Sequence, residues 1–247
     1  MKNKFLYILF INLSFFFHLP LRAQLSIDLE GNYIVSSPYN SVRIPASGGT
    51  SFDLEKDFSR STKFTFRIRP GITIKKRHVI SLLYAPLSID YSGEITSSVN
   101  YNGKVFSPGK LNANYKFNSY RITYRYKLVN NDKWTLALGL SGKIRDASIL
   151  LKNDSTSSGY PNVGFVPLVS FYASWRPVQL LKLVIEGDAL ASKQGRAEDI
   201  FAGIYFHLTQ KVALKAGYRI LEGGANNEKV YNFTCINYAS LGTVIEF

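Results

Sequence analysis

The sequence predicts an all-β protein: a closed, antiparallel, up-and-down β-barrel of about ten strands that spans a membrane. Three observations predict this fold. Polar and apolar residues alternate along most of the chain, the connections between these runs are short and long in turn, and the chain opens with a segment typical of export. Of its 247 residues, 46% are hydrophobic and 14% aromatic, which is too high a share for a disordered chain.

Residues 1–23 are typical of a signal peptide. Lys2 and Lys4 give the segment a positive start, an apolar run extends from Phe5 to Phe17, and a cut is expected after Ala23. The alternative is a membrane anchor, but the run is shorter than the roughly 20 residues that a membrane-spanning helix needs. We therefore expect cleavage on export and a mature chain, residues 24–247, that forms one barrel domain.

Alternation with a period of two residues marks the strands. From Lys63 to Arg69, Lys, Thr and Arg occupy one face and Phe and Ile the other, and the run from Tyr120 to Leu128 repeats this pattern. Such runs, rich in Tyr, Phe, Ile, Val and Thr, form strands rather than helices. The predicted strands lie near residues 25–35, 62–73, 77–95, 113–129, 134–151, 165–176, 180–191, 199–208, 212–222 and 230–247.

The connections alternate in length. The short polar turns are residues 75–77, 130–133, 176–179 and 209–211. The longer polar loops are residues 36–61, 96–112 and 152–164, with shorter members at 192–198 and 223–229. Strict alternation places all the longer loops at one end of an up-and-down sheet, as in membrane barrels, and a soluble sandwich has no reason to follow it.

Alternation alone leaves open which face points inward. A soluble barrel such as a lipocalin would bury the apolar face. A membrane barrel turns that face toward lipid, because every backbone group pairs within the closed sheet. Trp134, Trp175 and Tyr126 lie beside short turns, where an aromatic girdle would mark the edge of a bilayer. With the export segment, this girdle favours the orientation in which the apolar face meets lipid.

The last strand carries the most specific motif. Residues 240–247 read SLGTVIEF, which resembles the terminal strand of Gram-negative outer-membrane β-barrels, with Ser240, Gly242, Ile245 and Phe247 at the pattern positions. The resemblance implies an outer-membrane location and recognition of this strand by the barrel-assembly machinery. In size and loop style the chain is similar to the small barrels related to OmpW and OmpX. Those barrels commonly have about eight strands, so eight is the alternative to ten.

With the apolar face outward, many charged side chains point into the lumen. They are Asp28, Glu30, Arg67, Arg69, Arg121, Arg125, Lys143, Arg145, Lys182, Glu186, Asp188, Lys215 and Arg219. Glu30 and Arg67 lie at similar depth on neighbouring antiparallel strands, so we expect them to pair. Barrels of about eight strands are filled by side chains, whereas open channels appear near 16. A space-filling ion-pair network is therefore expected, and the alternative is a narrow pore that favours anions.

The sequence favours a non-catalytic role, as a structural envelope protein or a narrow pore for small solutes. The mature chain has two histidines, His78 and His207, and both lie beside short turns rather than in the long loops where outer-membrane enzymes hold their bases. We expect no catalytic residue, cofactor or metal site. A lipid-modifying enzyme and a loop-mediated binding or adhesion protein are the alternatives.

The net charge of +13 bears on the partners of the protein. Basic loop residues would meet lipopolysaccharide phosphates and outer-membrane lipids, as expected of almost any such barrel. Nucleic acid is excluded as a partner, because the chain is exported and offers neither a helix nor an aromatic platform to read bases. We expect a monomer.

Overall fold

The structure is a computed structural model that describes residues 23–193 and 195–247. Apart from Ala23, the predicted signal peptide lies outside the described residues. The wall of the barrel is built from β1 (Ala23–Arg43), β4 (Phe64–Ile74), β5 (His78–Ala85), β6 (Ser88–Ile95), β9 (Gly109–Asn130), β10 (Trp134–Lys152), β11 (Ser157–Val178), β12 (Leu181–Ser192), β13 (Gly195–His207), β14 (Val212–Asn226) and β15 (Tyr231–Glu246). Among the described residues, no helix is long and apolar enough to cross a membrane.

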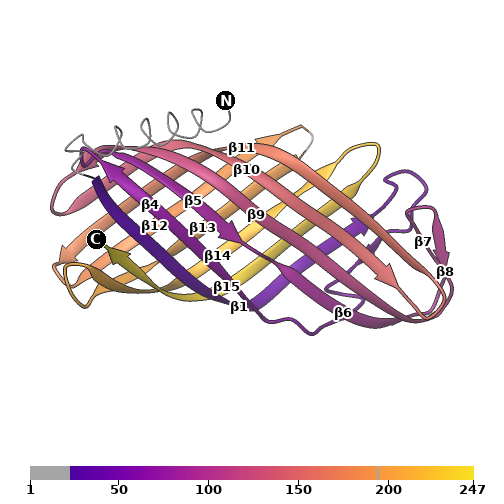
Figure 1. The fold of residues 1–247 in the computed structure, drawn as a ribbon. Coiled ribbons are helices and arrows are strands. Elements are labelled where there is room, and N and C mark those ends of the chain that lie inside the picture. The colour runs from indigo at the N-terminus through magenta and orange to yellow at the C-terminus, as the bar shows by residue number, and fades with distance from the viewer. Residues whose placement is uncertain (1–22, 194) are drawn as a thin grey trace, which may run out of the picture.

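The wall closes into an antiparallel barrel of ten strands, as the sequence predicts. Sequential strands pair from β9 to β15, and β15 pairs with β1 to close the sheet. The strands β5 and β6 both pair with β9 and together form a single wall strand, interrupted at Pro86 and Leu87. The alternative of eight strands is therefore wrong. Figure 1 shows the tilted strands, with the short turns at one end and the long connections at the other.

The apolar face of the wall points outward. On β4, Phe64 and Phe66 are 72% and 47% exposed, while Arg67 beside them is buried. On β10, Leu138 and Leu140 are exposed and alternate with inward residues. The orientation predicted for a membrane barrel is thus confirmed, and the lipocalin-like alternative, with an apolar interior behind a cationic surface, is wrong.

The strands run further toward the long-loop end than the sequence predicts. β1 continues to Arg43 and β11 begins at Ser157, so the expected loops 36–61 and 152–164 are partly strand. The hairpin of β10 and β11 stays paired out to Lys152 and Ser157. These extensions carry polar residues on both faces, so alternation does not mark them, although their backbones complete the same hydrogen-bond ladders.

An apolar core occupies part of the long-loop end of the barrel. The chain between β1 and β4, which includes β2 (Phe52–Asp53) and β3 (Ser59–Arg60), and the hairpin of β7 (Val99–Tyr101) and β8 (Lys104–Phe106) supply part of it. Leu54 and Phe106 are fully buried against wall residues such as Tyr115. The hydroxyl of Tyr101 donates to the carbonyl of Ile149 at 2.8 Å, and burial raises the pKa of Tyr101 above its ordinary value. We call this cluster the outer core.

Candidate functional site in the lumen

A layer of ion pairs crosses the middle of the lumen. Its members come from inward positions of β1, β4, β9, β12, β13 and β14, where alternation places them opposite the lipid-facing side chains. We call this set the ion-pair layer. It consists of Asp28, Glu30, Arg67, Arg69, Arg121, Arg125, Glu186, Asp188, Asp199, Lys215 and Arg219.

Asp199 occupies the centre of the ion-pair layer. Its carboxylate lies 2.9 Å from Arg67, 2.6 Å from Arg121 and 2.7 Å from Arg219. Asp199 is not among the residues that the sequence predicts for the lumen, although it is the first residue of the predicted strand 199–208. Its register with the inward Phe201 was the signal that could have placed it there.

Glu30 links three strands at the same level. Its carboxylate lies 2.7 Å from Arg219, 2.6 Å from Lys215 and 3.6 Å from Arg67. The predicted pairing of Glu30 with Arg67 is confirmed, since the two residues also stand opposite each other in the pairing of β1 with β4.

Glycine in the intervening strand permits these contacts. Gly242 of β15 stands between Glu30 of β1 and Lys215 of β14 in the sheet, so their ion pair passes over a position without a side chain. A Cβ atom at Gly242 would lie 2.2 Å from the carbonyl oxygen of Leu29. The glycine at this position of the terminal motif is therefore explained by packing within the barrel itself.

The ion-pair layer continues toward the short-turn end. Both carboxylate oxygens of Glu186 accept hydrogen bonds from Arg69 at 2.7 Å, and one also accepts from Arg125 at 3.0 Å. Asp188 accepts from Arg121 at 2.7 Å and from the hydroxyl of Ser141 at 2.8 Å. Such charge-assisted bonds, several of them bidentate, are the strongest that proteins form.

The charges of the ion-pair layer nearly cancel. Six cations, the five Arg residues and Lys215, face five acids, and Asp199 supplies one of these. A strong cationic field, which would attract anions into the middle of the lumen, is therefore absent from the described part of this layer.

The other three charged residues predicted for the lumen lie outside the ion-pair layer. The ammonium of Lys143 sits 4.5 Å from the ring centre of Phe117, and Arg145 donates a hydrogen bond to Asn162, both toward the long-loop end. Lys182 sits 5.1 Å from the ring centre of Tyr205, toward the short-turn end.

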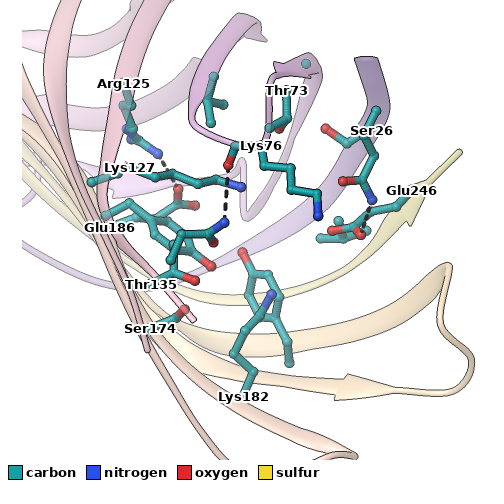
Figure 2. A pocket seen from close by; sticks show the side chains of 18 of the residues that line it. Ser26, Thr73, Lys76, Arg125, Lys127, Thr135, Ser174, Lys182, Glu186 and Glu246 are labelled. Atoms are coloured by element: carbon teal, nitrogen blue, oxygen red, sulfur yellow. Dashed lines mark hydrogen bonds and ion pairs between the residues drawn. The ribbon is translucent and has the colours of Figure 1, made fainter. Parts of the chain in front are cut away.

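A polar cavity of about 530 Å³ occupies the lumen at the short-turn end. Figure 2 shows Lys76, Lys127 and Lys182 reaching into it from three sides, with Glu246 near Lys76. Arg125 and Glu186 of the ion-pair layer form part of its lining. The cavity therefore ends at this layer.

The other residues of the terminal motif take part in the seam between β15 and β1. The hydroxyl of Ser240 donates to the side-chain oxygen of Asn32 at 2.6 Å, and the backbone N–H of Phe247 donates to Leu25 at 2.9 Å. Ile245 pairs with Ile27 of β1. Recognition of this strand by the assembly machinery stays a prediction.

The two histidines lie near the short-turn end. Nδ1 of His78 is 2.9 Å from the hydroxyl of Tyr124, and the ring packs against Tyr126. His207 ends β13, where its backbone N–H donates to Leu180. Among the described residues, no three or more His, Cys, Asp or Glu side chains are grouped so that they could hold a metal ion.

Comparisons with known proteins place the chain among barrels of similar build. No protein-family model and no curated relative matches the sequence. Neisserial surface protein A is 14% identical with a TM-score of 0.34, covering 91% of this chain and 97% of its own. The outer-membrane protease OmpT of Escherichia coli is 9% identical (TM-score 0.49, covering 91% and 97%), and the outer-membrane protein OprG of Pseudomonas aeruginosa is 10% identical (0.36, 92% and 97%). This chain is similar to these outer-membrane proteins in fold.

Proposed function

We propose that the protein is an integral outer-membrane β-barrel with a non-catalytic, structural role in the envelope, and that its lumen is closed to solutes. The observation that carries this proposal is the ion-pair layer. Its central side chains, those of Arg121, Asp199 and Arg219, are 1–2% exposed. A solute on this path would have to separate several buried, charge-assisted pairs at once.

The outer core supports the same conclusion from the other side of the layer. The outer core consists of apolar side chains packed against one another. Val42, Leu54 and Phe106 within it have no exposed surface. A barrel of ten strands also lies near the size at which side chains fill the interior. Both features favour a closed barrel over the narrow anion pore.

The outer surface supports a place in a membrane. Lipid-facing apolar side chains are exposed on all ten wall strands, and Trp134 and Trp175 stack at 5.9 Å beside the short turns. Because backbone groups in lipid must pair internally, a closed barrel is a form in which strands can cross a bilayer. The terminal motif supports the outer membrane as the bilayer concerned.

The placement of the histidines supports a non-catalytic role. His78 contacts tyrosines, and neither His78 nor His207 is hydrogen-bonded to a serine or carboxylate side chain of the described residues. The paired nucleophile and base that hydrolases and acyl transferases use is not assembled around them.

Planar-bilayer recording of the purified, refolded protein tests the proposal. We expect no discrete conductance steps, with an open porin refolded in the same way as the positive control. Discrete, anion-selective steps from the wild-type protein would overturn the closed lumen and support the pore instead.

A further inference from the structure

A second cavity, of about 440 Å³, lies at the long-loop end between β10, β11, β13 and β14. Its lining is mostly apolar and includes Phe117, Ile149, Phe165, Leu190 and Leu221. Cavities of this volume and character are typical of sites for small, largely apolar ligands. Ile149 and Leu221 of this lining belong to the outer core, and no residue of the ion-pair layer lines the cavity.

The cavity lies at a gap in the pairing of the wall. β11 pairs with β12 only from Val169 toward the short-turn end, and its residues 157–168 pair with β10 alone. The lining includes Phe165 on one side of this gap and Leu190 on the other. Val163 and Phe165 are each 70% exposed on the outer face. A chain-like apolar ligand could therefore lie partly in the cavity and partly against the outside of the barrel.

Lys143 reaches this cavity as a buried amine that is not ion-paired within the described part of the chain. The residue is 3% exposed and lines the cavity, and its ammonium contacts the Phe117 ring, yet it forms no ion pair with any described carboxylate. Lys215 shows the contrast, because its equally buried ammonium lies 2.9 Å from Asp28 and 2.6 Å from Glu30. Burial without an ion pair disfavours the protonated amine, and an anionic ligand in the cavity supplies the counter-charge that stabilises it.

Other groups around Lys143 also favour a negatively charged ligand. Arg145 lines the cavity, and its buried Nε atom has no hydrogen-bond partner among the described residues. The acid in the lining, Glu222, is held by Arg196 at 2.7 Å. The cavity thus offers Lys143 and Arg145 to an incoming anion, and Lys229 is a further basic residue of its lining.

We propose that this cavity binds an amphiphile through its anionic head and one acyl chain. The head accepts hydrogen bonds from Lys143 and Arg145, and the chain lies along Phe165 and Leu190 toward the gap between β11 and β12. A free fatty acid and an anionic membrane lipid share this chemistry, and the experiment below separates them.

Binding of radiolabelled palmitate to the refolded full barrel in phosphatidylcholine nanodiscs tests the site. We expect saturable binding of one palmitate per chain. Methyl palmitate, which lacks the negative charge, and the variant Lys143→Met, which keeps the length of the side chain, should each weaken binding about tenfold or more, because a hydrogen bond to a charged group is lost. Lys182→Met is the matched control, since Lys182 also packs on an aromatic ring but lies in the other cavity, and it should bind as the wild type does.

A second variant keeps the proposal testable if Lys143→Met fails to fold. Ala147 lines the cavity without bearing charge, so Ala147→Phe should fill the space and abolish palmitate binding while both cations remain. Wild-type affinity in both variants, or equal affinity for palmitate and its methyl ester, would overturn the site. Nanodiscs that contain phosphatidylglycerol identify the source. If phosphatidylglycerol competes with palmitate, the site belongs to an anionic membrane lipid. If palmitate binding is undiminished, the site belongs to a free fatty acid.

Discussion

Asp199 is the single residue on which the middle of the lumen most depends. Its carboxylate touches three guanidinium groups, those of Arg67, Arg121 and Arg219. Asp199→Asn keeps the shape but leaves these cations short of one counter-charge in a buried place. We expect the free energy of unfolding to fall by about 3–5 kcal/mol, the usual cost of removing one partner from a buried pair. Urea unfolding of the protein in lipid vesicles measures the change.

An exposed pair in the same barrel provides the control. Asp146 lies 2.9 Å from Lys116, and both side chains are in contact with solvent. Asp146→Asn should leave the urea midpoint nearly unchanged, because solvent screens such pairs. Equal midpoints for Asp199→Asn and Asp146→Asn would show that the ion-pair layer adds little stability.

The sequence predicted one ion pair of the layer, and the register of β1 and β4 also sets Asp28 opposite Arg69, 3.2 Å apart. Glu30 and Arg67 are on adjacent strands joined through the register of β1 and β4, so their depth follows from counting residues. The contacts of Arg69 with Glu186 and of Arg121 with Asp199 cross the lumen between strands that are not neighbours. Those contacts depend on the tilt and stagger of the closed sheet, which alternation does not encode.

At the scale of the element, β15 needs a residue without a side chain at Gly242, where the ion pair of Glu30 and Lys215 passes over the strand. Gly242→Ala would bring a Cβ atom to 2.2 Å from the Leu29 carbonyl and into the path between Glu30 and Lys215. Because the obstacle is backbone of the closing seam, we expect a loss of about 1–3 kcal/mol, typical of overpacking. The urea midpoint and the yield of the refolded, heat-modifiable form on gels measure it.

Gly31 offers a matched control on the same seam. It pairs with Leu241 of β15, and a Cβ atom there would meet its nearest neighbour at 3.8 Å, an ordinary contact. Gly31→Ala should therefore refold with the wild-type yield. If both alanine variants behaved alike, the space at Gly242 would not be the reason for glycine at that position.

The elements themselves could be predicted better than their ends. All ten wall strands were expected, because lipid on one side and a polar lumen on the other impose strict alternation. Beyond the lipid that constraint disappears. The first residues of β11, from Ser157 to Asn162, are mostly Ser, Gly, Pro and Asn, which are typical of loops, although they pair with β10.

At the scale of the whole molecule, the interior is divided along its axis into an open polar cavity, the ion-pair layer and the apolar outer core. The sequence predicted the charged part, since those residues alternate with lipid-facing ones. It did not predict the outer core, because part of that core, including Leu54 and Phe106, comes from segments without periodicity that meet the wall only after the barrel closes.

The even number of wall strands fixes which parts of the protein face the same way. Both described ends of the chain, at Ala23 and Phe247, lie with the short turns, and the hairpin of β7 and β8 lies at the opposite end (Figure 1). If the barrel closes in the outer membrane with its short turns toward the periplasm, the hairpin projects outside the cell.

Cysteine labelling of intact cells tests this orientation. In a Cys235→Ser background, Lys104→Cys, in the exposed tip of the β7–β8 hairpin, should react with a membrane-impermeant maleimide. Asp132→Cys, in the exposed turn between β9 and β10, should react only after the outer membrane is permeabilised. Both sites are exposed in the barrel, so a difference in labelling reports the membrane rather than the fold. If intact cells label Asp132→Cys but not Lys104→Cys, the barrel has the opposite orientation. If both variants label equally in intact cells, the barrel does not lie in the outer membrane.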